Sequence, residues 1–346
     1  MHASYLLSIY GCRDASLQVL NRHPCYYREM NDKTKAPIDN PHIIRSGRLD
    51  VGDGHEVYWV DWGNPDVEEP VFFLHGGPGG GFAVWHLDCF DPAQHRVIFH
   101  DQRGSGRSAP FASTEANTTE HLVNDITKLK DELGFQRISL FGFSWGSTLS
   151  LLYAIANPQI VNNMLIGGIY LARETDKQFY LEGSIKTHFP EVWQRFAGGV
   201  PGSSDNSVAE EYKASMQNLK SASGKRLAKE WMIYEASILK LDYSPPDVER
   251  NLSEFASESL AYLEAHYLLN GCFIDENYIL DNADAIKHID TIIVHGRYDF
   301  ICMPSAAYEL QQAIGDKAKL HFVTAGHSTG DVVQREVVKA YARMLW

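Results

Sequence analysis

Short apolar runs recur along this chain, and they are nearly continuous rather than alternating with polar residues. The runs are residues 71–74, 97–99, 138–141, 164–166, 291–294 and 320–323. Such runs are typical of parallel strands that are buried on both faces of a sheet. The pattern therefore predicts a mostly parallel sheet whose strands come from two separate parts of the chain.

Helical spacing fills the intervals between these predicted strands. Apolar residues recur at every third or fourth position over residues 122–133, which predicts an amphipathic helix. Asn117 and Glu120 predict a capping box at its start, and Gly134 predicts its end. A second, buried helix is predicted over residues 148–156. This alternation of strands and helices predicts a doubly wound α/β fold.

The apolar runs are absent from residues 171–280, where amphipathic stretches carry many aromatic side chains. This change predicts a helical cap inserted into the sheet domain. The predicted organisation is an N-terminal extension (1–45), a catalytic domain in two parts (46–170 and 281–346) and the cap. The apolar patch at residues 5–10 is too short to span a membrane and lacks the basic flank of a signal peptide. An irregular extension is expected, and a targeting role stays open.

Charge and cysteine usage narrow the function classes. Lys and Arg number 31 against 44 Asp and Glu in 346 residues, a net charge of −13. No basic block could follow a phosphate backbone, so nucleic acid is not an expected partner, whereas a pocket for cationic substrates is compatible. The five scattered cysteines, without any C-x-x-C pair, favour the cytoplasm and predict no metal site. No cofactor or oligomeric state is indicated.

Gly142, Ser144 and Gly146 form a G-x-S-x-G pentapeptide between a predicted strand and a predicted helix. A strand, sharp turn and helix present a serine hydroxyl where it can attack a carbonyl. The pentapeptide alone recurs by chance in proteins. Ser144 is therefore a nucleophile only if partner residues occur elsewhere.

Two candidate partners follow predicted strands near the end of the chain. Asp299 comes after the run 291–294, and His327 after the run 320–323. An isolated Asp in such a place is commonly a turn residue, and an isolated His commonly a surface or core residue. The order Ser144, Asp299, His327 is, however, that of α/β-hydrolase triads, and the carboxyl ends of parallel strands share one edge. We expect His327 to exchange the Ser144 proton and Asp299 to orient the imidazole.

A glycine-rich stretch, HGGPGGG, follows the first predicted strand, where such hydrolases supply an oxyanion-binding N–H. We expect the backbone N–H groups of Gly77 and Trp145 to bind the oxyanion. A nucleotide loop is the alternative, but Phe82 breaks the G-x-G-x-x-G spacing. Residues 104–109 do fit G-x-G-x-x-A, yet Pro110 would obstruct the helix that a dinucleotide site requires.

Five blocks make a more specific pattern: HGGPGGG at 75–81, DQRGSGRSAP at 101–110, GFSWGSTL at 142–149, GRYD at 296–299 and AGHS at 325–328. Together they resemble the proline iminopeptidase (prolyl aminopeptidase) family of serine peptidases, from about residue 46 to the end of the chain. The resemblance implies an α/β-hydrolase fold with a helical cap and no metal. It also implies peptide substrates with a free N-terminus, from which proline is released.

The same resemblance implies substrate-binding residues. Glu235 and Glu264 resemble the family's amine-binding glutamates, and both lie among aromatic residues, where a cation would offset the cost of an unpaired carboxylate. The alternative for each is a solvated helix face. Tyr170 stands where the family has a phenylalanine that packs on the proline ring. Phe143 replaces a glycine and Gly167 an arginine, so these departures bear on substrate preference rather than on hydrolysis.

The leading hypothesis is a serine aminopeptidase with proline as the expected first residue. An esterase or amidase with the same triad, but without an amine site, is the alternative. A non-catalytic binding module of the same fold is a second rival, although no triad residue type is missing. An epoxide hydrolase or dehalogenase would carry aspartate at position 144.

Overall fold

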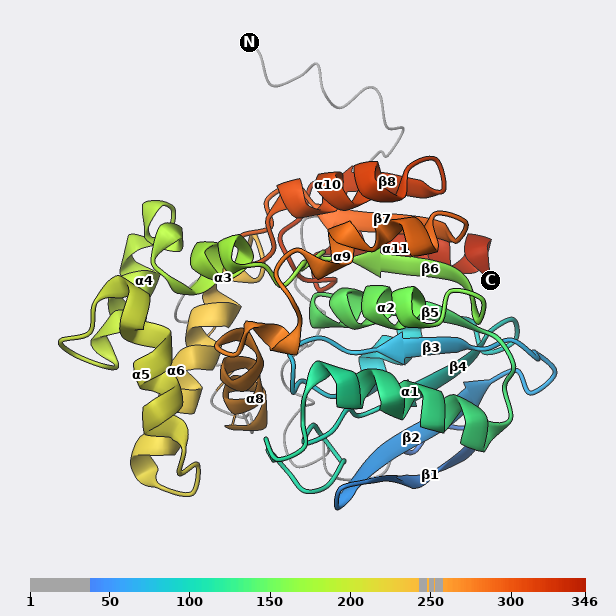
Figure 1. The fold of residues 1–346 in the computed structure, drawn as a ribbon, viewed down its shortest axis with the longest axis horizontal. Helices are drawn as coiled ribbons and strands as arrows, with labels where there is room; N and C mark the ends of the chain where they lie inside the picture. Colours follow the sequence, from blue (N-terminus) through green and yellow to red (C-terminus); the bar gives the residue numbers. More distant parts are fainter. Residues whose placement is uncertain (1–37, 243–247, 249–251, 253–257) are drawn as a thin grey trace, which may run out of the picture.

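The computed structural model describes residues 38–242, 248, 252 and 258–346 of the chain. An eight-stranded sheet runs through it in the order β1-β2-β4-β3-β5-β6-β7-β8 (Figure 1). Most of the expected N-terminal extension lies outside the described residues. Its expected boundary after residue 45 falls inside β1, which already begins at Ile43.

The sheet is mostly parallel, as the apolar runs predicted. Only the β1–β2 and β2–β4 pairs are antiparallel among the pairings along this order. The strands are β1 (Ile43–Gly52), β2 (His55–Gly63), β3 (Val71–Leu74), β4 (Arg96–His100), β5 (Ile138–Phe143), β6 (Val161–Gly167), β7 (Asp290–Gly296) and β8 (Ala318–Val323). The six predicted strands are confirmed. The antiparallel strands β1 and β2 were not predicted; β1, at the edge of the sheet, is largely exposed and lacks a continuous apolar run.

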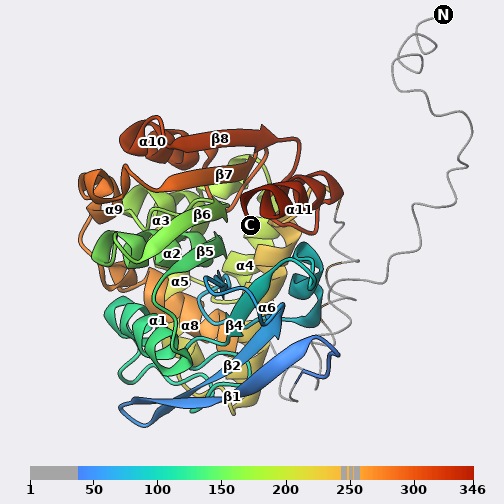
Figure 2. The same cartoon turned by 90° about the vertical axis from the view of Figure 1, so that its right-hand side faces the viewer.

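Helices cover both faces of the sheet (Figure 2). One core cluster joins the sheet to α1 (Thr119–Leu133), α2 (Trp145–Ala156) and α10 (Pro304–Ile314). A second cluster lies under α11 (Val332–Leu345) on the opposite face. The short helix α9 (Tyr278–Asp281) precedes β7. The molecule therefore has three layers, with the sheet in the middle. Because β5, β6, β7 and β8 are parallel, their carboxyl ends lie at one edge of the sheet.

A group of helices lies between β6 and β7 in sequence and beside the carboxyl edge of the sheet in space (Figure 1). These helices are α3 (Glu174–Leu181), α4 (Pro190–Gly198), α5 (Val208–Met216), α6 (Ala222–Ile238) and α8 (Glu258–Leu268). Phe196 stacks on Tyr212 and Tyr234 with ring centroids 4.4 and 4.3 Å apart. The cap therefore has an aromatic core of its own, although its predicted boundaries stay a prediction.

The start of α1 differs from the sequence expectation. Thr118, not Asn117, is the N-cap residue, and its side chain makes no capping hydrogen bond. The Asn117 amide instead donates to the carbonyl oxygens of Arg103 and Ser113 and accepts from the Tyr267 hydroxyl at 2.6 Å. The predicted capping box is therefore wrong, because tertiary contacts use the Asn117 side chain. The predicted end at Gly134 is confirmed, with φ 84°.

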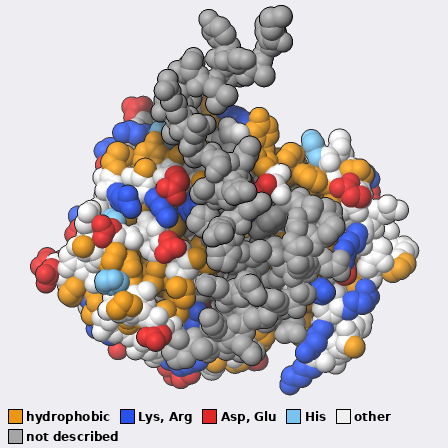
Figure 3. Space-filling model, turned by 180° about the vertical axis from the view of Figure 1, so that it is seen from behind, with side chains coloured by type: hydrophobic (Ala, Val, Ile, Leu, Met, Phe, Trp, Pro, Cys, Tyr) orange, Lys and Arg blue, Asp and Glu red, His pale blue; other side chains and the backbone are white. Residues whose placement is uncertain are grey.

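The visible rear surface carries acidic and basic side chains together, with hydrophobic side chains between them (Figure 3). Among the described residues, no helix is both long and apolar enough to cross a membrane.

Candidate active site

Ser144 occupies a strained turn between β5 and α2. Its backbone has φ 56° and ψ −129°, a conformation that non-glycine residues rarely adopt. A Cβ atom on Gly142 would lie 2.1 Å from the Gly146 carbonyl oxygen, and one on Gly146 would lie 2.0 Å from that of Leu74. The two glycines therefore permit the close approach of backbone that this turn needs, and the turn presents Ser144 at the carboxyl edge of the sheet.

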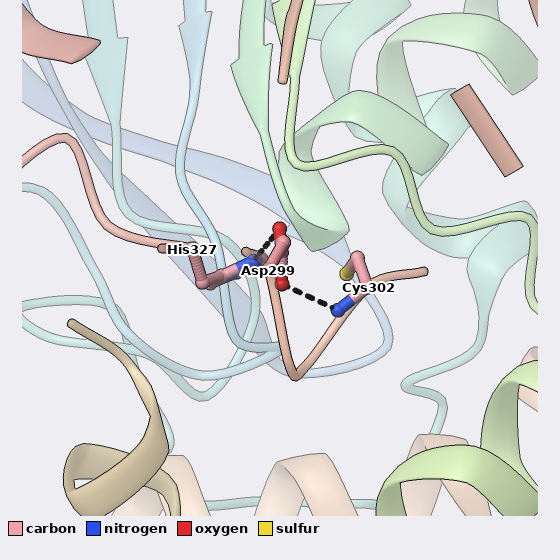
Figure 4. Close-up of side chains that lie close together, drawn as sticks. All are labelled: Asp299, Cys302 and His327. Atoms are coloured by element: carbon pink, nitrogen blue, oxygen red, sulfur yellow. Dashed lines mark hydrogen bonds and ion pairs between the residues drawn. The ribbon is translucent and has the colours of Figure 1, made fainter. Parts of the chain in front are cut away.

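Asp299 and His327 form a buried hydrogen-bonded pair at the same edge (Figure 4). His327 Nδ1 lies 2.8 Å from Asp299 Oδ2. The other carboxylate oxygen accepts the backbone N–H groups of Ile301 and Cys302 at 2.9 and 2.8 Å. These bonds hold the Asp299 carboxylate and place the His327 ring proton on Nδ1, which leaves Nε2 able to accept a proton.

The interaction between Asp299 and His327 favours the charged form of each side chain. Burial raises the pKa of Asp299, but the charge and hydrogen bond of His327 outweigh burial and bring this pKa below its ordinary value. Burial lowers the pKa of His327, whereas the charge and hydrogen bond of Asp299 raise it above its ordinary value. The arrangement can therefore stabilise an imidazolium ion.

Two neighbours support this pair and were not predicted. His295 Nδ1 accepts the Ile169 N–H at 3.0 Å, and His295 Nε2 lies 3.4 Å from Asp299 Oδ2. Burial lowers the pKa of His295, which keeps its ring neutral. Gln334 donates from Nε2 to the carbonyl oxygen of His327 at 3.1 Å. His295 lies four residues from Asp299 and Gln334 seven residues from His327, but neither side chain was expected to contact the triad.

Gly168 separates the serine from the histidine. Its φ is +51°, and a Cβ atom there would lie 3.0 Å from His327 Cε1 and 3.3 Å from the Ser144 backbone nitrogen. The Ser144 side chain hydrogen-bonds with the Cys302 thiol; burial raises the pKa of Cys302 well above its usual value, and the Ser144 bond opposes this rise. The serine hydroxyl must turn from Cys302 toward His327 Nε2 to be deprotonated, a rearrangement often seen between free and substrate-bound enzymes.

Asp299, Cys302 and His327 also bring three metal-ligating atoms within 4.8 Å of one another (Figure 4). The Asp299 carboxylate and His327 Nδ1 already bond to each other. A coordinating cysteine must be a thiolate, whereas burial raises the pKa of this thiol. These residues therefore fit a hydrogen-bonded pair better than a metal site, and the expected absence of a metal or cofactor stays a prediction.

The glycine-rich loop after β3 lies against Ser144. A Cβ atom on Gly76 would lie 3.4 Å from the Ser144 Cβ and 4.0 Å from its hydroxyl oxygen. Helix α8 packs on the loop, because a Cβ atom on Gly79 would lie 2.9 Å from the Ser259 carbonyl oxygen. The backbone of Gly77 has φ 116°. Gly77 and Trp145 thus belong to the two segments that flank the serine, and their role as oxyanion donors stays a prediction.

Glu235 on α6 and Glu264 on α8 meet in the cap, where their side chains hydrogen-bond to each other. Glu264 is 4% exposed and accepts the Trp231 indole N–H at 2.7 Å. Burial and then the charge of Glu235 raise the pKa of Glu264 well above its usual value. Neither residue is on a solvated helix face.

Glu235 has spare hydrogen-bonding capacity. Its buried Oε2 atom has no hydrogen-bond partner among the described residues. Burial raises the pKa of Glu235, and the charge of His327 lowers it. A buried carboxylate oxygen without a donor is costly, so a cationic group that reached this atom would offset that cost.

The residues that depart from the family pattern lie together. Phe143 on β5 pairs with Gly167 on β6, and a Cβ atom on Gly167 would lie 2.3 Å from Phe143 Cε1. The Phe143 ring packs in the core under α11, with its centroid 5.5 Å from that of Phe141. The absence of a side chain at Gly167 accommodates the bulk of Phe143. Tyr170 is buried and hydrogen-bonds with Cys272.

Comparisons with known proteins agree with this geometry. A model of the alpha/beta hydrolase fold family matches residues 69–331, and fold and site define an alpha/beta hydrolase. A proline iminopeptidase of Arabidopsis thaliana is 37% identical over 313 residues, which cover 89% of this chain and 81% of that protein. A proline iminopeptidase of Neisseria gonorrhoeae is 38% identical over 83% of this chain and 92% of that protein. The chain belongs to the proline iminopeptidase family.

Solved structures agree on the fold alone. An alpha/beta hydrolase from a deep-sea metagenome library has a TM-score of 0.62 at 15% identity and covers 86% of this chain and 97% of its own. The proline iminopeptidase of Mycobacterium smegmatis has a TM-score of 0.58 at 18% identity, and the match covers 87% of this chain and 97% of that chain.

Proposed function

We propose that this protein is a serine aminopeptidase that releases the N-terminal residue of peptides, with proline as the preferred residue. The observation that carries the proposal is the pair of cap carboxyl groups, Glu235 with its buried Oε2 atom and the buried Glu264, beside a hydrogen-bonded Asp299–His327 pair. The two similar proteins of Arabidopsis thaliana and Neisseria gonorrhoeae are named proline iminopeptidases, which supports the same activity here.

The carboxylate pair supplies the selectivity. Glu235 has a buried oxygen atom that no described residue bonds to, and Glu264 is held by Trp231. A charged imino or amino group would donate to both glutamates and so offset the cost of burying them. An internal or acylated residue has no such charge, so the enzyme would act on free N-termini. Tyr170 lines the place of the first side chain.

The reaction then follows from the arrangement of the triad. Ser144 attacks the carbonyl of the first residue as His327 Nε2 takes its proton, and Asp299 stabilises the resulting imidazolium. The N–H groups of Gly77 and Trp145 bind the oxyanion of the tetrahedral intermediate. His327 returns the proton to the leaving amine. Water then attacks the acyl group on Ser144, with His327 as the base that takes the water proton and returns it to the Ser144 oxygen.

The substrates are peptides with a free N-terminus, and the site of action is the cytoplasm. The thiols of Cys89, Cys272 and Cys302 are free and buried, which is the usual state of cysteine in a reducing compartment. Nucleic acids and membranes are not expected partners, since the chain carries a net charge of −13.

A paired substrate experiment tests the proposal. We expect prolyl arylamide to be hydrolysed and its N-acetylated form to be hydrolysed far more slowly, because acetylation removes the charge that Glu235 and Glu264 bind. Alanyl and hydroxyprolyl arylamides in the same assay measure the preference for proline. Ser144→Ala serves as the control for contaminating activity, with a loss of up to roughly 10⁶-fold. Equal turnover of the free and acetylated compounds would favour the esterase or amidase alternative.

A further inference from the structure

One buried side chain connects the two segments that flank Ser144. Gln102 follows β4 and is 2% exposed. Its Nε2 atom donates to the carbonyl oxygen of His75 at 2.9 Å, and its Oε1 atom accepts the indole N–H of Trp145 at 3.0 Å. An indole N–H can only donate and a carbonyl can only accept, so the orientation of the amide is fixed by its partners.

Both partners adjoin the segments that carry the expected oxyanion donors. His75 begins the glycine-rich loop that contains Gly77, and Trp145 directly follows Ser144. The amide of Gln102 therefore spans from one segment to the other. A change in its length or hydrogen bonding would alter the distance between the two backbone N–H groups.

A second contact from the same residue holds the loop. The backbone N–H of Gln102 donates to His75 Nε2 at 2.9 Å, and His75 Nδ1 lies 2.8 Å from the Gly76 carbonyl oxygen and 3.2 Å from the Gly81 nitrogen. Burial lowers the pKa of His75, which keeps the ring neutral and this bonding pattern intact. Gln102 thus contacts the loop through its side chain and its backbone.

We propose that Gln102 is a positioning residue for the oxyanion hole, which sets the separation of the Gly77 and Trp145 N–H groups through His75 and the Trp145 indole. This inference rests on the proposed function, since it concerns the same acyl-transfer step. Donors stabilise a transition state only when they are held at hydrogen-bonding distance from the oxyanion before the reaction. The hydrogen bonds of the Gln102 side chain go to the oxyanion segments and not to Glu235 or Glu264, so Gln102 contributes to the rate rather than to amine binding.

Two substitutions separate the contributions of this amide. Gln102→Met removes both hydrogen bonds at similar length. Gln102→Glu keeps an acceptor for Trp145 but cannot donate to His75, and it remains informative if the first variant does not fold. The matched control is Asn163→Leu, which removes the hydrogen bond from Trp346 at the amino end of β6, the opposite edge of the sheet.

The expected signature is a loss of kcat with little change in ground-state binding. We expect kcat for prolyl arylamide to fall by up to roughly 100-fold in Gln102→Met, the lower end of the effect of removing one oxyanion donor. The aldehyde analogue of proline, which forms a tetrahedral adduct with Ser144, should lose affinity by a similar factor. Free proline, which forms no adduct, should bind as it does to the wild type. Asn163→Leu should change none of these quantities.

Labelling of Ser144 by a fluorophosphonate separates this inference from the proposed function, because it needs the serine and its oxyanion hole but no amine site. Slower labelling of both folded Gln102 variants than of the wild type supports the inference, even if prolyl arylamide is not a substrate. Wild-type rates of labelling and turnover in either folded variant would overturn it, as would equal losses of affinity for proline and its aldehyde. A wild-type protein that is not labelled would instead overturn the proposed triad, and this inference with it.

Discussion

The carbonyl oxygen of Leu239 accepts the backbone N–H of His327 at 2.9 Å. The N–H of Ser328 donates to the same carbonyl at 3.1 Å. Leu239 is the C-cap of α6, the helix that carries Glu235. The proposed amine-binding helix and the loop of the proposed catalytic base are therefore hydrogen-bonded to each other.

Helix α8 makes the corresponding contact on the other side of the site. It carries Glu264, and its residues Ser259 and Leu260 pack against Gly79 in the glycine-rich loop. Each glutamate thus stands on a helix that contacts one of the loops proposed to take part in hydrolysis. In the proposed mechanism this arrangement would let a cap that is distant in sequence hold the substrate amine at a fixed distance from Ser144.

The pH dependence of kcat/KM follows from the Asp299–His327 pair. The base must be neutral to accept a proton, and Asp299 raises the pKa of His327 above 6.5, its ordinary value, despite the opposing effect of burial. We expect kcat/KM to rise with pH through an apparent pKa above 6.5. In Asp299→Asn the acid limb should move to lower pH and kcat should fall by about 10⁴-fold, as in the serine protease triad. An acid limb at the same pH in both proteins would show that another group controls it.

Glu264→Gln should stabilise the free protein while weakening substrate binding. Burial raises the pKa of Glu264 well above 4.5, its ordinary value. Above pH 4.5 the unfolded chain therefore releases this proton while the folded protein keeps it, so the free energy of unfolding falls as pH rises toward the folded-state pKa. Glutamine does not titrate, and its advantage should grow over this pH window to roughly 1–3 kcal/mol.

Urea unfolding of the wild type and Glu264→Gln across this pH range measures the effect. Prolyl arylamide turnover in the same samples measures the accompanying loss of kcat/KM. A stability difference that does not change with pH would contradict the raised pKa of Glu264.

Phe143 and Gly167 should be energetically coupled. A Cβ atom on Gly167 would lie 2.3 Å from Phe143 Cε1 and 2.1 Å from the Val294 carbonyl oxygen. Gly167→Ala should therefore destabilise the protein by about 1–3 kcal/mol, the usual cost of overpacking. In a Phe143→Ala background the cost should be smaller, since only the clash with the Val294 backbone remains. Additive losses in this double-mutant cycle would show that the two positions do not share a packing site.

Local patterns account for much of the fold and of the site. The continuous apolar runs identified β3 to β8, although β8 at the edge of the sheet is only partly buried, and Ser144, Asp299 and His327 each follow one of these strands. Gln102 and Leu239 were not assigned roles, because their partners are long-range and depend on how the elements pack. His295 lies only four residues from Asp299, but its orientation depends on how β7 packs against Ile169. The capping box at Asn117 failed for the same reason, since Tyr267 lies 150 residues away in the sequence.

The departures from the family pattern illustrate a further limit. The sequence shows that Phe143 is large, but not which way its ring points. In the fold the ring fills the space beside Gly167 under α11, so two changes that each look disruptive compensate for one another. We therefore expect substrate preference to depend on Tyr170, whose hydroxyl bonds with Cys272, more than on Phe143.

Glu235→Gln tests the central claim, that buried cap carboxylates bind the substrate amine, most directly. The measurement is kcat/KM for prolyl arylamide and for an N-acetylprolyl ester in the wild type and the variant. Loss of one charge-assisted hydrogen bond is worth roughly 1.5–3 kcal/mol, or about 10–150-fold. We predict a loss of this size for the free amine and little change for the acetylated ester. An equal loss for both substrates would contradict the account and assign Glu235 a structural role.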